Sequence, residues 1–259
     1  MRFCCTGLTL LALSRQVAAG PIVLVGAEDD AAPWSYADGT GYVNDVVRAA
    51  FKRVGWTARL KVLPYARCKA MAVSGDLVAC FSASKTSELQ GMLLYPRHSI
   101  FEARNLLVSD ARSALSGCDF EQWVGHPVVG RVRGYEYIQR VETMFKSGHV
   151  GAAESDSEVS NLRKVSAGRL DAALVTVDAV KRLDVVVAQA HHAGHTFKTV
   201  CDFGAEPAYV AFSARHPQGR AALLAFEQGY DRLVDDGSIA ALQKMWRGKL
   251  LDRMRVKPH

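Results

Sequence analysis

The sequence predicts an α/β protein built as two similar lobes, each with a mainly parallel sheet flanked by helices. Short apolar runs, of which residues 77–81 are the clearest, lack polar alternation, as expected of strands that are covered on both faces. Runs of this kind alternate with helical patterns over residues 21–81 and again over 127–175. Such alternation is typical of parallel sheets with right-handed crossovers.

The first elements follow from local patterns. Residues 21–25 are apolar and β-branched and predict a strand. A helix is expected next, with Asn44 or Asp45 at its start and Gly55 at its end, because its apolar residues recur on one face. Residues 56–62 then alternate between apolar and polar side chains, which indicates a strand with one wetter face.

The stretch that begins at Pro64 contains the first candidate ligand surface. Pro64 can open a helix because its missing N–H would be unpaired there, and Gly75 is expected to end that helix. The buried strand follows, and Ser82, Ser84 and Lys85 lie at its C-terminal end. Open α/β sheets bind small molecules at this end of their strands.

The rest of the chain repeats the α/β pattern and then becomes helical. Gly134 and Tyr135 are expected to open a helix that ends near residue 145, and Gly168 to end another. Strands are predicted over residues 101–109, 127–132, 172–175 and 208–212, and amphipathic helices over 217–234 and 238–246.

Two α/β lobes joined by two crossing strands form a hinged clamp, in which a ligand lies in the cleft and closure buries it. The first lobe is expected over residues 20–110 and the second over 111–205. Residues 206–259 return to the first lobe and supply the C-terminal helices.

The N-terminus is typical of a secretory signal over residues 1–19. Arg2 precedes an apolar run over residues 3–13, and small side chains precede Gly20. The apolar run is too short to span a bilayer, and no later segment approaches the roughly 20 apolar residues that a membrane helix needs. We therefore expect a soluble, exported protein.

Two of the six cysteines lie in this signal, which leaves four in the mature chain. An even number in an oxidising compartment favours disulfides, and four cysteines allow three pairings. We favour Cys68 with Cys80, which would tie a helix to the strand after it, and Cys118 with Cys201, which would tie the ends of the middle segment. Four buried free thiols are the alternative.

Charge and motifs exclude several functions. The net charge is +6, and the basic residues are scattered rather than striped, which gives nucleic-acid binding little support. His191, His192 and His195 suggest a metal site, but no carboxylate or cysteine adjoins them, and a surface loop is favoured. The chain lacks the common hydrolase, P-loop and Rossmann motifs. We expect neither an enzyme nor a cofactor.

A series of short motifs is ordered along nearly the whole mature chain. They are Pro33-Trp34-Ser35-Tyr36, Gly41 with Asp45, Pro64 to Arg67, Ser74-Gly75-Asp76, Thr86 with Glu88, Tyr95-Pro96, residues 129–135, Gly168 to Ala172, and Asp236-Gly237 with Trp246. In these motifs the chain resembles the extracytoplasmic solute-binding proteins of polar amino acid ABC importers (solute-binding protein family 3).

The resemblance implies a periplasmic clamp of the type II binding-protein fold, monomeric, that passes a small solute to an ABC permease without chemistry. The family's ligand hydroxyls correspond to Ser82 and Ser84, and its second-lobe glycine to Gly134. The family's carboxylate-binding arginine corresponds to Leu89, and its amine-binding acid falls near Thr176. An ordinary α-amino acid is therefore not the expected ligand.

Other residues could replace the missing arginine. Arg67, Lys85 and Arg133 could supply positive charge, and Tyr135 could stack on a ligand. We therefore expect a small polar or anionic organic solute, amino-acid-like or an aromatic acid, in the cleft between the lobes.

Each of these assignments has an alternative. Arg67 could instead pair with Asp76, and Trp34 and Tyr36 could be core residues rather than a binding wall. An exported enzyme of the same fold, similar to the cyclohexadienyl dehydratases, and a ligand-sensing partner of a membrane receptor are the alternative functions.

Overall fold

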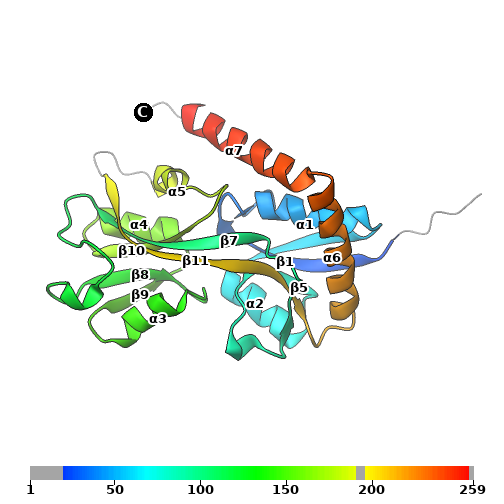
Figure 1. The fold of residues 1–259 in the computed structure, drawn as a ribbon, viewed down its shortest axis with the longest axis horizontal. Coiled ribbons are helices and arrows are strands. Elements are labelled where there is room, and N and C mark those ends of the chain that lie inside the picture. The colour runs from blue at the N-terminus through cyan, green and yellow to red at the C-terminus, as the bar shows by residue number, and fades with distance from the viewer. Residues whose placement is uncertain (1–19, 191–195, 257–259) are drawn as a thin grey trace, which may run out of the picture.

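One mixed sheet runs the length of the molecule, with helices on both faces (Figure 1). The structure, a computed structural model, describes residues 20–190 and 196–256. The strand order is β4-β1-β5-β11-β7-β10-β8-β9, and β6 pairs with β11. The predicted signal and the three neighbouring histidines lie outside the described residues.

The first half of the sheet is parallel where the sequence predicted it. β1 (Ile22–Glu28) pairs in parallel with both β4 (Thr57–Leu63) and β5 (Ala79–Ala83). Two helices, α1 (Tyr42–Arg53) and α2 (Tyr65–Ser74), cover its opposite faces (Figure 1). The smaller elements here are β2 (Asp30–Ala31), β3 (Ser35–Tyr36), β6 (Leu93–Leu94) and the 3-10 turn Ser87–Leu89.

The second half repeats this arrangement. β8 pairs in parallel with β9 and β10, and every residue of β10 is buried, as predicted for a doubly covered strand. The elements are a 3-10 turn (Phe120–Gln122), β8 (Val128–Val132), α3 (Gln139–Lys146), β9 (Gly151–Ser155), α4 (Glu158–Ser166), β10 (Ala172–Val177) and α5 (Leu183–Ala190).

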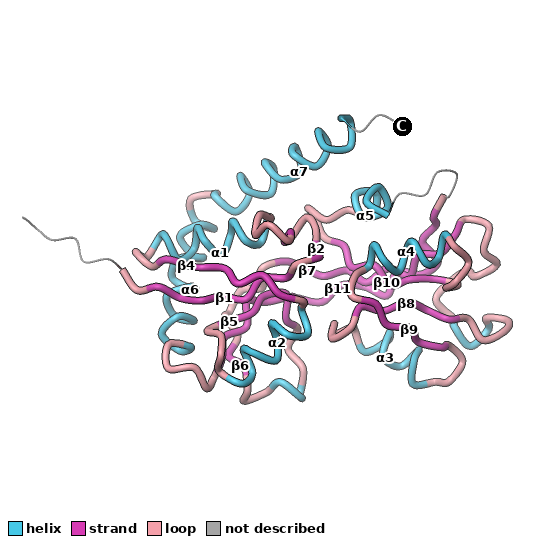
Figure 2. Tube along the Cα trace, turned by 180° about the vertical axis from the view of Figure 1, so that it is seen from behind, coloured by secondary structure: helices cyan, strands magenta, loops and turns pink. Residues whose placement is uncertain are grey.

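Two long antiparallel strands, β7 (Phe101–Asp110) and β11 (Phe197–Ser213), continue through both halves (Figure 2). β11 pairs with β7 up to Ala208 and with β5 from Tyr209 onward. The predicted end of the first lobe, residue 110, is the last residue of β7, and the predicted end of the second lobe, residue 205, lies inside β11. The division into lobes at these residues stays a prediction.

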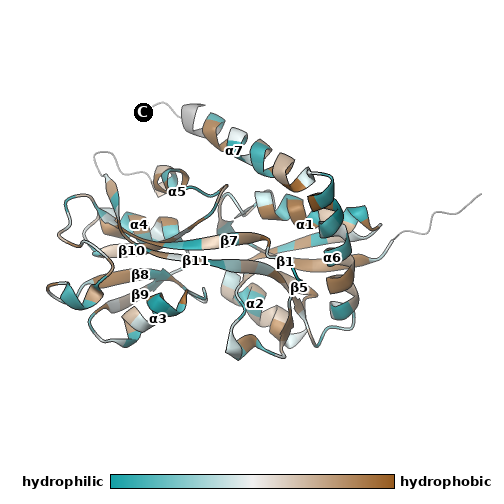
Figure 3. Cartoon of the chain, in the orientation of Figure 1, coloured by the Kyte–Doolittle hydropathy of each residue, from teal (hydrophilic) through white to brown (hydrophobic). Residues whose placement is uncertain are grey.

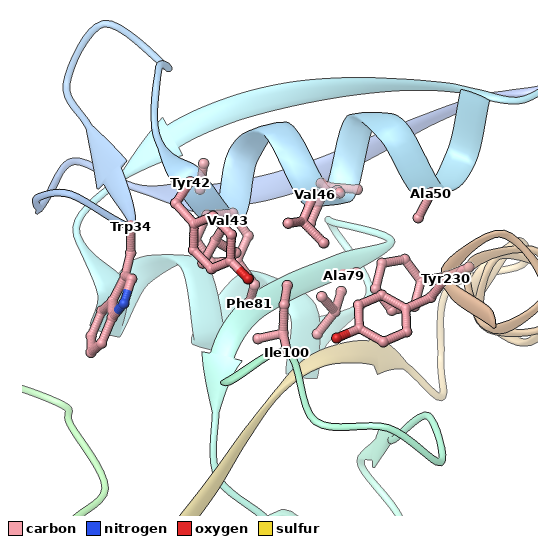
Figure 4. Close-up of a cluster of buried hydrophobic side chains, with 14 of the residues drawn as sticks. Trp34, Tyr42, Val43, Val46, Ala50, Ala79, Phe81, Ile100 and Tyr230 are labelled. Carbon is pink, nitrogen blue, oxygen red and sulfur yellow. The ribbon is translucent and has the colours of Figure 1, made fainter. Parts of the chain in front are cut away.

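The C-terminal helices return to the first half. α6 (Gly219–Asp235) packs against α1, and α7 (Ser238–Val256) follows it along the top of the molecule (Figure 1). The core beneath them contains Phe51, Phe81 and Phe226, and Figure 4 shows the part of this core under α1. Along α1 and α6 hydrophobic and hydrophilic residues alternate, as one-sided burial requires (Figure 3).

Two helix starts differ from their predictions. Gly41 precedes α1, so Asn44 lies in the first turn, where its amide donates to Ser35 Oγ (3.0 Å) and to two loop carbonyls. α3 begins at Gln139, so Gly134 and Tyr135 lie in a loop rather than at a helix N-terminus. β9 and α5 were not predicted.

Both predicted disulfides are confirmed. Cys68 in α2 is bonded to Cys80 in β5, with Cα atoms 5.8 Å apart. Cys118 is bonded to Cys201 in β11, with Cα atoms 4.8 Å apart. Among the described residues, no helix has both the length and the apolar character to cross a membrane.

The contact between α1 and α6 depends on Gly229. A methyl group at this position would lie 1.9 Å from the carbonyl oxygen of Ala50, whereas one at Gly248 in α7 would meet nothing within 4 Å. We expect Gly229→Ala to lower the free energy of unfolding by about 1–3 kcal/mol through overpacking. Gly248→Ala, the matched control, should raise it by up to about 1 kcal/mol through helix propensity. Denaturant titration measures both, and equal effects would contradict the packing argument.

Candidate functional site

The candidate site is a cavity where the two halves meet at the crossing strands. It is small, with a volume of about 30 Å³, so a solute of amino-acid size requires the halves to move apart. The first half contributes Trp34, Tyr65, Ser82 and Ser84, the crossing strands contribute Phe101, Ala103, Asn105, Glu206 and Ala208, and the second half contributes Tyr135, Glu136 and Thr176.

Ser82 carries the backbone strain of the site. Its φ is 68°, and it is the only non-glycine residue with positive φ in the described part of the chain. Its Oγ is buried and has no hydrogen-bond partner. Strained backbone and an unpaired buried hydroxyl both cost free energy, and such features concentrate at ligand sites.

Trp34 forms an aromatic wall of the cavity. It is 2% exposed and stacks on Phe101, with ring centroids 4.2 Å apart. Figure 4 places Trp34 at the edge of the hydrophobic cluster, with its ring pointing away from α1. Its indole Nε1 is buried without a partner. Trp34 is therefore both a core residue and a wall of the cavity, two roles that the sequence analysis treated as alternatives.

A buried ion pair lies beside this wall. Lys181 Nζ is 2.6 Å from Glu158 Oε2 and 4.0 Å from the centroid of the Trp34 ring, and the two charged side chains are 2% and 6% exposed. The other oxygen of Glu158 accepts a hydrogen bond from the backbone N–H of Thr176 at 2.8 Å. Asp178 accepts two backbone hydrogen bonds in the turn that positions Lys181. No local pattern in the sequence indicated this pair.

Polar contacts across the cleft hold the two halves together. The Tyr135 hydroxyl donates to the carboxyl group of Glu28 at the end of β1. The Tyr65 hydroxyl donates to Glu136 Oε2 at 2.5 Å, and Lys69 Nζ forms an ion pair with the other oxygen of Glu136. Each contact joins a residue of the first half to one of the second, so opening the cleft breaks all of them.

The close approach at this point requires Gly134. Its φ is 81°, in the region that favours glycine, and a Cβ there would lie 2.7 Å from the Cβ of Ala66 in α2. Its carbonyl oxygen accepts a hydrogen bond from Lys69 Nζ at 2.7 Å. Gly134 therefore contributes to the site through its backbone carbonyl and through its lack of a side chain.

Burial changes the ionisation of the acids around the cavity. It raises the pKa of Glu28 to about 8, although the hydrogen bond from Tyr135 and the charge of Lys181 act in the opposite direction. Burial, and then the charge of Glu136, raise the pKa of Glu206. Glu28 is therefore largely protonated at neutral pH.

The structure brings together only some of the predicted site residues. Ser82, Ser84, Tyr135 and Thr176 line the cavity, and Gly134 adjoins it. Sequence reasoning missed Tyr65, Phe101, Asn105, Glu136 and Glu206 as lining residues. Only Tyr65 and Glu136 lie next to positions that the sequence singled out, Pro64 and Tyr135.

The predicted cations lie elsewhere. Arg133 points to Glu154 and Asp156, with N–O distances of 3.3 and 3.0 Å, and is 58% exposed. Lys85 is exposed, and its Nζ lies 4.2 Å from the centroid of the Tyr209 ring. Arg67 is exposed on α2. None of these lines the cavity, so the argument for an anionic solute loses its basis.

Tyr36 also lies outside the cavity lining. Its ring stacks on Trp246 of α7, with centroids 6.2 Å apart. Asp76, the alternative partner proposed for Arg67, accepts a hydrogen bond from Ser74 Oγ at 2.7 Å. Leu89, at the position of the family's arginine, is buried.

Comparison with known proteins shows the fold. No family model matches the chain, and no curated protein matches its sequence. An ancestral arginine-binding protein bound to arginine is 18% identical over 88% of this chain and 99% of its own, with a TM-score of 0.72. An arginine transport system periplasmic binding protein from Legionella pneumophila is 13% identical over 88% and 100%, with a TM-score of 0.69.

A third similar structure has a sensory role in its name. A histidine kinase sensor domain with similarity to periplasmic binding proteins is 17% identical over 89% of this chain and 97% of its own, with a TM-score of 0.71. At these identities the likeness concerns the fold alone, and it confirms the predicted two-lobed α/β clamp.

The raised pKa of Glu28 makes stability depend on pH. Between the ordinary pKa of 4.5 and about 8 the folded state holds a proton that the unfolded state has lost, so the free energy of unfolding falls as pH rises. We expect a contribution of roughly 1 kcal/mol per pH unit in this window. Glu28→Gln should remove this contribution and be more stable than the unchanged protein at the upper end of the window.

Denaturant titrations at several pH values test this prediction. Glu121→Gln, a change at an exposed carboxylate, is the control and should leave the pH dependence unchanged. If Glu28→Gln and Glu121→Gln show the same pH dependence, Glu28 is not buried as described.

Proposed function

We propose that this protein is a periplasmic solute-binding protein that closes on a small polar organic solute and passes it to an ABC importer. The observation that carries the proposal is the cavity at the crossing strands, which both halves line and in which the strained Ser82 holds an unpaired hydroxyl. The fold supports it, since similar structures include arginine-binding proteins and a periplasmic transport component.

Binding and closure are coupled in this proposal. The hydroxyls of Ser82 and Ser84 belong to the first half and are available when the cleft is open. Tyr135 and Thr176 belong to the second half and reach the solute only on closing. A solute that contacts all four binds the closed form more tightly, and this difference in affinity drives the movement.

The role that we assign is binding without catalysis. The similar structures named above are binding proteins and a sensor domain, which favours recognition over chemistry. We propose that the chain acts as a monomer, with the solute and an ABC permease as partners. The anionic solute is not carried over, because its three predicted cations lie outside the cavity lining.

The periplasm is the proposed compartment. The two disulfides fit an oxidising environment, and residues 1–19 have the composition of a secretory signal. A solute-binding partner of an importer operates in the same compartment.

A thermal-shift panel tests the proposed function. We expect at least one class of compound among amino acids, amines, aromatic acids and sugar acids to raise the melting temperature, because a ligand that binds only the folded state stabilises it. Ser84→Ala should weaken binding of that compound by roughly two- to ten-fold, the loss of one hydrogen bond, and Tyr135→Ala should weaken it further.

Ser87→Ala is the matched control, since Ser87 is exposed on the turn just after Ser84 and does not line the cavity. Its binding should equal that of the unchanged protein. Unchanged affinity in both Ser84→Ala and Tyr135→Ala would show that the cleft is not the binding site.

Export makes a separate prediction. Expression of the full chain in a Gram-negative host should release a processed protein into the periplasmic fraction, because the signal is removed after Ala19. Mass spectrometry of that fraction should find Gly20 at the N-terminus and both disulfides formed. Retention of residues 1–19 on cytoplasmic protein would contradict the proposed compartment.

A further inference from the structure

Resting on the proposed function, we infer that the solute is an organic amine, held through its ammonium group by Glu206 between the aromatic walls of the cavity. The argument has three parts: the charge of the lining, the way in which the protein binds its own ammonium groups there, and the groups that are left without partners.

The lining is acidic. Glu136 and Glu206 line the cavity, and none of the lining residues in the described chain is a lysine, arginine or histidine. Two lysines that lie against the rings of lining residues are already paired, Lys69 with Glu136 and Lys181 with Glu158. A carboxylate or phosphate solute would therefore meet two carboxylates and no cation in the lining.

The protein already binds two ammonium groups at these walls in the same way. Lys69 Nζ forms an ion pair with Glu136 and lies 5.3 Å from the centroid of the Tyr65 ring. Lys181 Nζ forms an ion pair with Glu158 and lies 4.0 Å from the centroid of the Trp34 ring. A carboxylate on one side and an aromatic face on the other is a favourable environment for an ammonium ion with little water.

Glu206 is the lining acid that forms no ion pair with a lysine among the described residues. It is half-buried, and among the described residues its carboxylate forms no hydrogen bond or ion pair, while the nearby charge of Glu136 opposes its ionisation. β11 pairs Glu206 with Ala103 of β7, and both line the cavity. An ammonium ion beside Glu206 would offset both its desolvation and this repulsion.

Unpaired polar groups at the same cavity indicate a bound molecule independently of the acids. Trp34, nine-tenths buried or more, has an indole N–H without a partner, and the hydroxyl of Ser82 is also unpaired. Burying such groups unpaired costs about 1–3 kcal/mol each. A polar solute that also carries an acceptor atom would satisfy them.

Isothermal titration of the processed protein tests the inference, with putrescine, succinate and L-arginine as probes. We expect putrescine to bind and succinate not to bind. Glu206→Gln, which keeps the shape of the side chain and removes its charge, should weaken putrescine binding by roughly ten-fold or more.

The matched control is Glu102→Gln. Glu102 is exposed and lies one residue before Ala103, so its side chain points to the opposite face of the sheet. Its putrescine affinity should equal that of the unchanged protein. Equal affinities of Glu206→Gln and Glu102→Gln for putrescine would overturn the inference.

Failure of this inference can be told apart from failure of the proposed function. If succinate binds and putrescine does not, or if L-arginine binds with an affinity that Glu206→Gln leaves unchanged, the amine inference is overturned and solute binding stands. If none of the probes binds and the thermal-shift panel shows no stabilising compound, both are overturned.

Discussion

The antiparallel pairing of β7 with β11 is the constraint on which the rest of the cleft depends. Both strands belong to the two halves at once, and their register sets Ala103 against Glu206 and Phe101 against Ala208. These four residues therefore share one face and line the cavity together. A slip of one residue would turn Glu206 away and bring Pro207 to the cavity, because side chains alternate between faces. Every polar group of the site is placed relative to this pair of strands.

Buried charges such as those in the cleft are a costly means of stabilising a fold. Removing a lysine and a glutamate from water costs several kcal/mol per ion, and their attraction only offsets that cost when the geometry is good. Lys181 and Glu158 meet this condition through the Thr176 N–H and the Trp34 ring. Glu28 and Glu206 do not, and burial raises the pKa of both. The cleft thus holds ionisable groups that stability alone would replace with apolar side chains.

Local features were predictable from the sequence, whereas contacts between distant segments were not. The helix that ends at Gly75, the buried strand β10 and both disulfides follow from spacing and composition. The partners of Lys69 and Lys181 do not, because ion pairs between separate elements leave no periodic trace. Arg133 shows the same limit, since it is three residues from Glu136 in sequence but pairs with Glu154 and Asp156 instead of lining the cavity.

The contacts that close the cleft also set the cost of opening it. For the proposed solute to enter, the halves must move apart, and the bonds from Tyr135 to Glu28 and from Lys69 to Glu136 must then break. The measured affinity is the intrinsic affinity reduced by the fraction of molecules that are open. In the proposed function, a solute recovers this cost only through new contacts in the closed cleft. The inferred ammonium group would gain such a contact at Glu206, whose ionisation is opposed by burial and by the charge of Glu136, whereas a carboxylate there would add to this repulsion.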